Sequence, residues 1–200
     1  MKKFMLLLAL VVTVSLTNAQ TTIWKIDPAH SNISFSVDYM VLTEVNGNFK
    51  EFSGTVQKEG NDFSKSTIEV TINALSITTE NEKRDGHLKS ADFFDVAKYP
   101  SVIFAGKSFE KTGENTYNIT GDLTMHGITK TVVISAKYAG EAKDPWGNTR
   151  EGFKGTTSVD RTDFGLVYNS TLETGGLLIG KNVTIALNVQ LIKQQQAGTN

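Results

Sequence analysis

The sequence predicts an all-β fold built from antiparallel strands. Two observations support this prediction: apolar and polar side chains alternate along several segments, and turn signals containing Gly, Asn or Asp separate those segments. Such alternation is the pattern of a strand with one buried face. Short strands at regular spacing are typical of an antiparallel sandwich or barrel. The chain of 200 residues is long enough for one domain with a sizeable core.

The alternating segments follow one another along most of the chain. The first is NISFSVDYM at 32–40 and the last is NVTIALNVQLI at 182–192. In a strand every second side chain points to the same face, so one face of each segment is expected to meet the core. The residues that share these apolar faces are Ile33, Phe35, Val37 and Tyr39; Ile68, Val70 and Ile72; Val102 and Phe104; Tyr117, Ile119, Leu123 and Met125; Val132, Ile134, Ala136 and Tyr138; and Val183, Ile185, Leu187, Val189 and Leu191.

The connection at 76–98 has no alternation. Thr78 or Thr79 is a candidate N-cap for a first helical turn, and Ser90 is a candidate for a second. Pro100 disfavours helix at the residue before it and favours an extended chain. We therefore expect one or two short helices around residues 78–98. A long ordered connection in an all-β domain is more often functional than idle.

The first 19 residues have the three parts of a secretory signal peptide. A positive start at Lys2 and Lys3 is followed by an apolar run at 4–16 and by small or polar residues. The run is shorter than the ~20 residues of a membrane-spanning helix. We expect cleavage after Ala19 and export to the periplasm or the medium, whereas an uncleaved anchor is the less favoured alternative. The domain is then expected at 20–193, with a polar tail at 194–200.

Composition excludes several kinds of partner and chemistry. Removing Lys2 and Lys3 leaves 18 of the 20 basic residues against 21 acidic ones, so the chain lacks the basic field that nucleic acid or an anionic membrane surface attracts. The chain has no Cys, which excludes thiol catalysis, Cys-bound metal and disulfides. We expect no nucleic-acid partner, no cofactor and no integral membrane span.

Arg84, Asp85 and His87 in the segment RDGH are the first candidates for chemistry. Asp85 and His87 are two residues apart, so on a helix their side chains diverge and do not form a catalytic pair. The favoured interpretation is structural: Arg84 and Asp85 anchor the connection, and His87 is a bonding partner. A polar mouth over a cavity and a catalytic group are the other interpretations.

Other motifs for chemistry are weak or missing. His30, His87 and His126 are widely separated, and no HExxH or HxH pair provides metal-ligand spacing. The segment TGGLLIG at 174–180 has neither GxGxxG spacing nor the Lys of a phosphate loop, and no GxSxG motif occurs. The many Phe and Tyr residues either fill a core or line the open lumen of a small barrel, and alternation does not decide between the two.

Five segments in order resemble the YceI-like family of exported, lipocalin-like proteins that bind polyisoprenoids. They are WKIDPAHSNISFSV at 24–37, VNGNFKEFSG at 45–54, INALSITTENEKRDGHLKSADFFDVAKYPSVIF at 72–104, ITGDLTMHGITKTV at 119–132 and DRTDFGLVYN at 160–169. The resemblance implies a single antiparallel lipocalin-like barrel of about eight strands, with helix in the long connection and an apolar pore for a long lipid chain. It implies no enzymatic activity.

This sequence departs from the family pattern at Tyr39, where members often have His, and at Thr43, where Ser is common. If the position of Tyr39 touches the ligand, headgroup preference or packing is expected to differ here. The predicted lumen consists of Ile33, Phe35, Val37, Tyr39, Phe49, Phe52, Ile68, Val70, Ile72, Phe104, Leu123, Met125 and Phe164. The predicted mouth or lid consists of Arg84, Asp85, His87, Leu88, Phe93, Phe94 and Arg161.

The leading hypothesis is non-catalytic binding, transport or storage of a polyisoprenoid or similar long-chain lipid in the cell envelope. The alternative is an enzyme that acts on a lipid-like substrate in the lumen, with Asp85, His87 or Tyr39 as acid or base. A third hypothesis is an interaction module with a filled barrel. The sequence leaves open which lipid is bound and whether two barrels form a homodimer.

Overall fold

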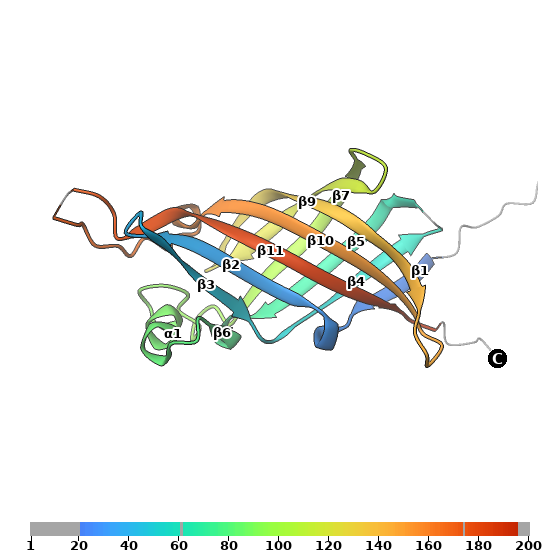
Figure 1. The fold of residues 1–200 in the computed structure, drawn as a ribbon, viewed down its shortest axis with the longest axis horizontal. Coiled ribbons are helices and arrows are strands. Elements are labelled where there is room, and N and C mark those ends of the chain that lie inside the picture. Colours follow the sequence, from blue (N-terminus) through green and yellow to red (C-terminus); the bar gives the residue numbers. More distant parts are fainter. Residues whose placement is uncertain (1–20, 61, 174, 196–200) are drawn as a thin grey trace, which may run out of the picture.

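The computed structural model describes residues 21–60, 62–173 and 175–195 and shows a closed antiparallel β-barrel with α1 beside one end (Figure 1). This confirms the fold class predicted from the sequence. The predicted signal peptide at 1–19 and residues 196–200 of the predicted tail lie outside the described residues.

The described residues form eleven strands, one α-helix and three 3-10 helices. The strands are β1 (Thr21–Ile26), β2 (Asn32–Tyr39), β3 (Thr43–Phe49), β4 (Phe52–Glu59), β5 (Asp62–Asn73), β6 (Ile77–Thr78), β7 (Ser101–Lys111), β8 (Thr116–Met125), β9 (Ile128–Lys143), β10 (Thr149–Asp160) and β11 (Ile179–Lys193). The α-helix is α1 (Glu82–Lys89), and the 3-10 helices are η1 (Pro28–His30), η2 (Ala74–Ser76) and η3 (Arg161–Phe164).

Eight strands close the barrel in the order β1-β4-β5-β7-β8-β9-β10-β11, and β11 pairs back to β1. The strands β2, β3 and β6 continue the sheet from β11 at one end. β1 and β2 lie end to end along β11, since Ile26 pairs with Leu191 and Asn32 pairs with Asn188. The helix η1 separates β1 from β2, so one wall of the barrel is an interrupted strand.

Two glycines let aromatic rings lie flat against the inside of the sheet. Gly47 of β3 pairs with Phe35 of β2, and a Cβ at Gly47 would lie 2.4 Å from the Phe35 ring. Gly121 of β8 pairs with Gly106 of β7, and a Cβ at Gly121 would likewise lie 2.4 Å from the ring of Phe104, two residues before Gly106. A side chain at either glycine would displace a ring from the barrel interior, because interiors are close-packed.

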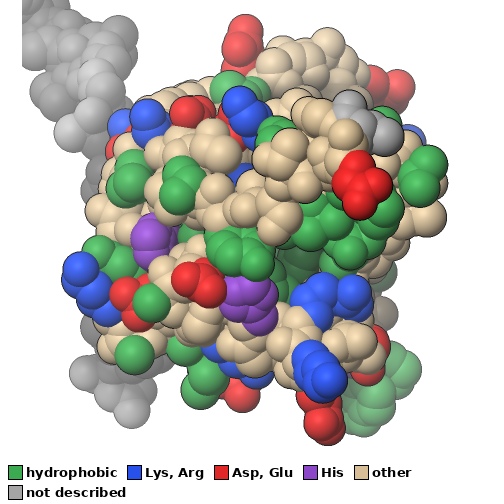
Figure 2. Space-filling view, turned by 90° about the vertical axis from the view of Figure 1, so that its left-hand side faces the viewer, with side chains coloured by type: hydrophobic (Ala, Val, Ile, Leu, Met, Phe, Trp, Pro, Cys, Tyr) green, Lys and Arg blue, Asp and Glu red, His purple; other side chains and the backbone are tan. Residues whose placement is uncertain are grey.

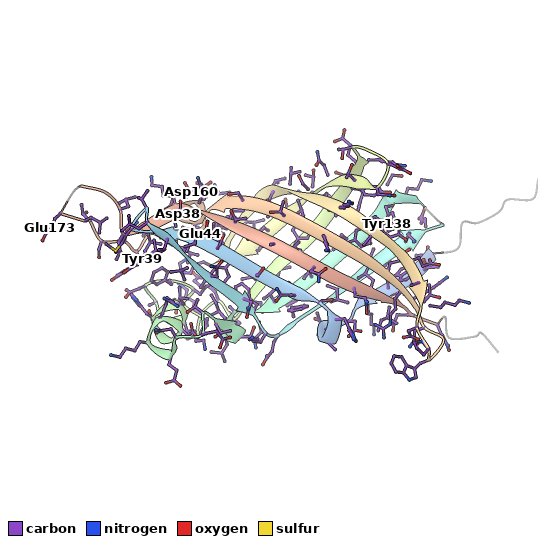
Figure 3. The ribbon with its side chains drawn as sticks, viewed as in Figure 1. Asp38, Tyr39, Glu44, Tyr138, Asp160 and Glu173 are labelled. Carbon is purple, nitrogen blue, oxygen red and sulfur yellow. The ribbon has the colours of Figure 1, made fainter. Side chains whose placement is uncertain are left out.

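One end of the barrel is filled with side chains. Trp24, Val56 and Leu191 form a buried cluster where β1, β4 and β11 meet. Beside it, the ring of Phe63 contacts four other aromatic rings, those of Phe109, Tyr117, Tyr138 and Phe153, at centroid distances of 5.2–6.2 Å. We call these two groups together the filled end. Figure 3 labels Tyr138 there, far from Tyr39 and Glu44.

The helix α1 lies in the connection where helix was predicted, but its cap is not the predicted one. The side chain of Asn81 is the N-cap and accepts a hydrogen bond from the backbone N–H of Arg84 at 3.0 Å. Thr78 and Thr79 instead donate to Asp85. Ser90 ends α1 as its C-cap and does not start a second α-helix, because the chain beyond it forms turns.

Candidate ligand-binding cavity

The barrel encloses a cavity of about 780 Å³ at the end opposite the filled end. Small-molecule sites usually have about 300–1,000 Å³. Figure 2 looks at this end and shows hydrophobic side chains around a hollow, with basic and His side chains beside it. Most of the lining consists of aliphatic and aromatic side chains from the inner faces of the strands. An extended apolar molecule therefore fits the chemistry of this cavity better than a polar one.

Most of the predicted lumen residues line this cavity. They are Ile33, Phe35, Val37, Tyr39, Phe49, Val70, Ile72, Phe104, Leu123 and Met125. Three others do not. Ile68 packs against the Trp24 cluster of the filled end, and Phe164 lies in η3 with 1% of its surface exposed. Phe52 is buried at the start of β4 but contributes nothing to the lining.

Alternation had indicated other lining residues that the predicted site left out. They are Val102, Val132, Ile134, Val183, Ile185, Leu187 and Val189, which all belong to the apolar faces read from the sequence. Val159 of β10 also lines the cavity, although no clean alternation marks that strand. The final strand β11 thus lines the cavity with several aliphatic side chains, although the predicted lumen included no residue of this strand.

The long connection and η3 together form one side of the cavity mouth. Arg84, His87, Leu88, Phe93, Phe94 and Arg161 all line the cavity. The ring of Phe94 meets that of Phe49 edge-on, at a centroid distance of 6.0 Å, so the connection packs directly on β3. We call the segment 79–100 the lid.

Asp85 does not line the cavity, because its carboxylate is turned to the start of the lid. It accepts hydrogen bonds from Thr79 N at 2.7 Å and from Thr78 Oγ1 at 2.8 Å. Arg84 Nε donates to Thr79 Oγ1 at 2.7 Å. Burial would raise the pKa of Asp85, but the hydrogen bonds from Thr79 and Thr78 outweigh it and lower the pKa. Arg84 and Asp85 thus hold the lid through Thr79 rather than through an ion pair with each other.

His87 contacts two side chains of the lid and one side chain of the loop that follows η3. Its Nε2 lies 2.8 Å from Asp92 Oδ2. Its ring packs edge-on against Phe93 at 5.0 Å and against Tyr168 at 4.6 Å. The ring nitrogen that bonds Asp92 is therefore already engaged, and the ring itself closes the mouth between the lid and residue 168. This geometry favours a packing role over acid–base chemistry.

Arg161 is a buried cation that holds the loop between η3 and β11. Only 4% of its surface is exposed, and burial lowers the pKa of Arg161. Its guanidinium donates to the carbonyl oxygens of Gly180 at 2.8 Å and Tyr168 at 3.0 Å, and also to that of Leu166. Its position in the cavity wall thus depends on carbonyl oxygens from both ends of the loop.

The filled end contains an ion pair inside the barrel that no motif in the sequence indicates. Lys58 Nζ lies 2.5 Å from Glu151 Oε1 and 4.5 Å from the centroid of the Phe63 ring. Burial raises the pKa of Glu151, and the Lys58 hydrogen bond opposes that rise. Burial and the charge of Glu151 raise the pKa of Tyr138 to about 12. Neither Lys58 nor Glu151 lines the cavity.

Among the residues that the structure describes, no group of three or more His, Asp or Glu side chains is arranged to hold a metal ion. In the same part of the chain, no helix combines the length and the apolar character needed to cross a membrane.

Comparison with known proteins gives a matching family model and similar sequences. A family model described as the YceI-like domain matches residues 24–191. A UPF0312 protein of Pseudomonas savastanoi pv. phaseolicola is 41% identical over 137 residues, which cover 68% of this chain and 71% of that protein.

Two solved structures share the fold. BcnA of Burkholderia cenocepacia is 24% identical and has a TM-score of 0.72, with 82% of this chain and 98% of that chain covered. A polyisoprenoid binding domain of Saccharophagus degradans, implicated in plant cell wall breakdown, is 14% identical and has a TM-score of 0.64, with 86% and 98% covered. At these identities the two structures support the fold alone.

Proposed function

Since the chain belongs to the YceI-like family, we propose that it binds and carries a polyisoprenoid or similar long-chain lipid, without catalysis, in the cavity of its barrel. The observation that carries the proposal is the apolar cavity of about 780 Å³, which is lined by strand side chains and lies beside a packed lid. The solved polyisoprenoid binding domain with the same fold supports this choice of ligand class.

The energetics of such binding need few polar contacts. Each methylene that leaves water gains about 0.8 kcal/mol. A tail of several isoprene units therefore gains on the order of ten kcal/mol before the costs of ordering and association. A polar headgroup would stay at the mouth, where Glu44, Asn81, Lys83 and Arg84 belong to the lining.

The lid geometry supports binding over an enzyme. Asp85, one of the residues weighed as an acid or base, is turned away from the cavity and bonded to Thr79. His87 is engaged by Asp92 and packed between aromatic rings. Tyr39 lines the cavity, but neither Asp85 nor His87 is free to serve as its partner in proton transfer.

The cell envelope completes the proposal, and the signal-peptide pattern of residues 1–19 supports it. Fractionation of a producing cell, with detection of the processed N-terminus at residue 20, tests this location. Recovery of unprocessed chain in the cytoplasm would contradict it.

Native mass spectrometry of the gently purified protein tests ligand binding. We expect a bound apolar molecule, and added geranylgeraniol should bind to protein stripped of it. Val183→Trp fills the cavity from the inner face of β11 and should abolish binding, whereas Thr184→Trp lies on the exposed outer face and should leave it unchanged. A wild-type protein that stays empty, or a Val183→Trp variant that binds normally, would contradict the proposal.

A further inference from the structure

An exposed apolar surface lies at the mouth of the cavity. The turn between β2 and β3 exposes 82% of Val41 and 79% of Leu42, and Met40 is 37% exposed. The loop between η3 and β11 adds Val167 at 67% and Leu177 at 42%. We call these five residues the apolar rim. Single exposed apolar residues need no explanation, but a contiguous group usually marks an interaction site.

Hydrogen bonds hold the two parts of the rim together. Met40 N donates to the carbonyl oxygen of Leu178 at 2.8 Å, and Tyr39 pairs with Ile179. Leu177 bridges back to Thr171 within the loop. The exposed side chains are therefore presented on a bonded framework rather than on unattached chain.

The rim also contains backbone strain. Met40 and Val41 have φ of 56° and 60°, the left-handed region that non-glycine residues, and β-branched ones above all, rarely adopt. Leu42 N closes the turn on the carbonyl oxygen of Tyr39 at 3.1 Å. Asn-Gly would form such a tight turn with less strain. Val41 therefore combines a strained backbone with a largely exposed apolar side chain. Because neither feature stabilises the fold, the turn is a candidate functional site.

The rim is continuous with the cavity lining. Tyr39, Tyr168 and Leu178, which adjoin the rim residues in the chain, all line the cavity. A molecule that leaves the cavity at this end therefore passes from the apolar cavity lining to the apolar rim. Outside the protein, a lipid tail is stable in the apolar interior of a bilayer, so a lipid surface matches the rim better than a protein partner does.

Charge near the rim restricts the kind of surface. Figure 3 shows Asp38, Glu44 and Glu173 at the same end as Tyr39. All three are exposed. They offset the basic side chains at the same mouth, Lys83 and Arg84, so this end has no one-sided positive charge to attract anionic headgroups. The match is therefore with an uncharged or zwitterionic membrane surface, held by apolar contact.

We propose that the apolar rim docks on a zwitterionic lipid bilayer, so that ligand passes directly between the bilayer and the cavity. The transfer step rests on the proposed lipid-carrier function, whereas docking itself does not require a bound ligand. Docking by apolar side chains strengthens with the apolar area that enters the interface.

Sedimentation with sucrose-loaded phosphatidylcholine vesicles tests docking on unloaded protein. We expect wild type to bind and the V41S/L42S variant to bind about tenfold more weakly, since two aliphatic side chains leave the contact. The matched control is Trp146→Ser, which removes an 81% exposed residue from the β9–β10 turn at the other end of the barrel. Equal binding by wild type and V41S/L42S, or stronger binding after phosphatidylglycerol is added, would overturn the proposal.

Transfer of NBD-labelled geranylgeraniol from the protein to the same vesicles tests passage of ligand. A rate that rises with vesicle concentration, and that falls in V41S/L42S but not in W146S, is expected. A rate independent of vesicle concentration means that the probe leaves through water, which would overturn direct transfer while leaving lipid binding intact. If wild type does not bind the probe, the carrier function and direct transfer both fail, and sedimentation still decides docking.

Discussion

The Lys58→Met substitution tests how the filled end is stabilised. Lys58 and Glu151 are only 7% and 2% exposed in their side chains, and 2.5 Å separates Nζ from Oε1. Met keeps much of the side-chain volume but removes the cation, so the carboxylate of Glu151 remains buried without its partner. Breaking a buried pair in this way costs about 3–5 kcal/mol of the free energy of unfolding.

The loss should depend on pH because Glu151 titrates. Burial raises the pKa of Glu151 above its usual 4.5, and Lys58 holds that rise in check. Without Lys58 the folded pKa rises further. When the pKa of a carboxyl is higher in the folded than in the unfolded state, its protonated form is tolerated in the folded protein and its ionised form is penalised. The full stability is therefore present below the unfolded pKa and is lost as the pH rises through the folded pKa. The variant should therefore approach wild-type stability near pH 4.5 and fall furthest behind above the raised pKa of Glu151.

Urea unfolding followed by circular dichroism, at about pH 5 and about pH 8, measures both effects. Lys107→Met is the matched control, because Lys107 forms an exposed pair with Asp122 at 2.7 Å. Loss of an exposed pair costs about 1 kcal/mol or less. The double variant Lys58→Met with Glu151→Leu should recover most of the stability. The reasoning is refuted if Lys58→Met costs no more than Lys107→Met, or if its cost does not grow with pH.

Three further substitutions test the lid and the cavity wall. Asp85→Asn weakens the hydrogen bonds that Thr79 donates, and should reduce the stability of the lid by about 1–3 kcal/mol. Amide hydrogen exchange in the lid should then become faster, and unchanged exchange would contradict this expectation. Gly47→Ala places a methyl group 2.4 Å from the Phe35 ring; it should lower both thermal stability and probe affinity, and a variant with wild-type values would show that the ring can move at no cost. Phe94→Ala opens the lid and should speed probe dissociation about tenfold in stopped flow, whereas an unchanged rate would mean that probe does not leave past the lid.

Alternation predicts which face of a strand meets the interior, but not the depth of a residue along the barrel. Ile68 and Ile72 share a face of β5, yet only Ile72 lines the cavity. Ile68 pairs with Val56, which pairs with Trp24, so large side chains already fill the barrel at that level. Depth depends on which strands pair at each level, and a single strand's pattern does not contain that information.

Contacts between distant segments were the least predictable. Lys58 and Glu151 are 93 positions apart, and only the pairing of β4 and β10 through β1 and β11 brings them together. In the lid, Asn81 and Thr79 both had a side chain suited to capping, and α1 begins after Asn81 because Thr79 is bonded to Asp85 and Arg84. The motif RDGH lies in the lid, and Arg84 and Asp85 bond there to Thr79, a partner that the sequence alone did not identify.

The filled end and the apolar rim lie at opposite ends of the barrel, which makes their roles separable. Lys58→Met should change the free energy of unfolding and leave vesicle binding unaltered. V41S/L42S should do the reverse, since Val41 and Leu42 are exposed. Distant substitutions without shared partners usually add within about 0.5 kcal/mol. If the combined variant departs from additivity in either measurement, the filled end takes part in docking, and the barrel does not act as a rigid container with a single working end.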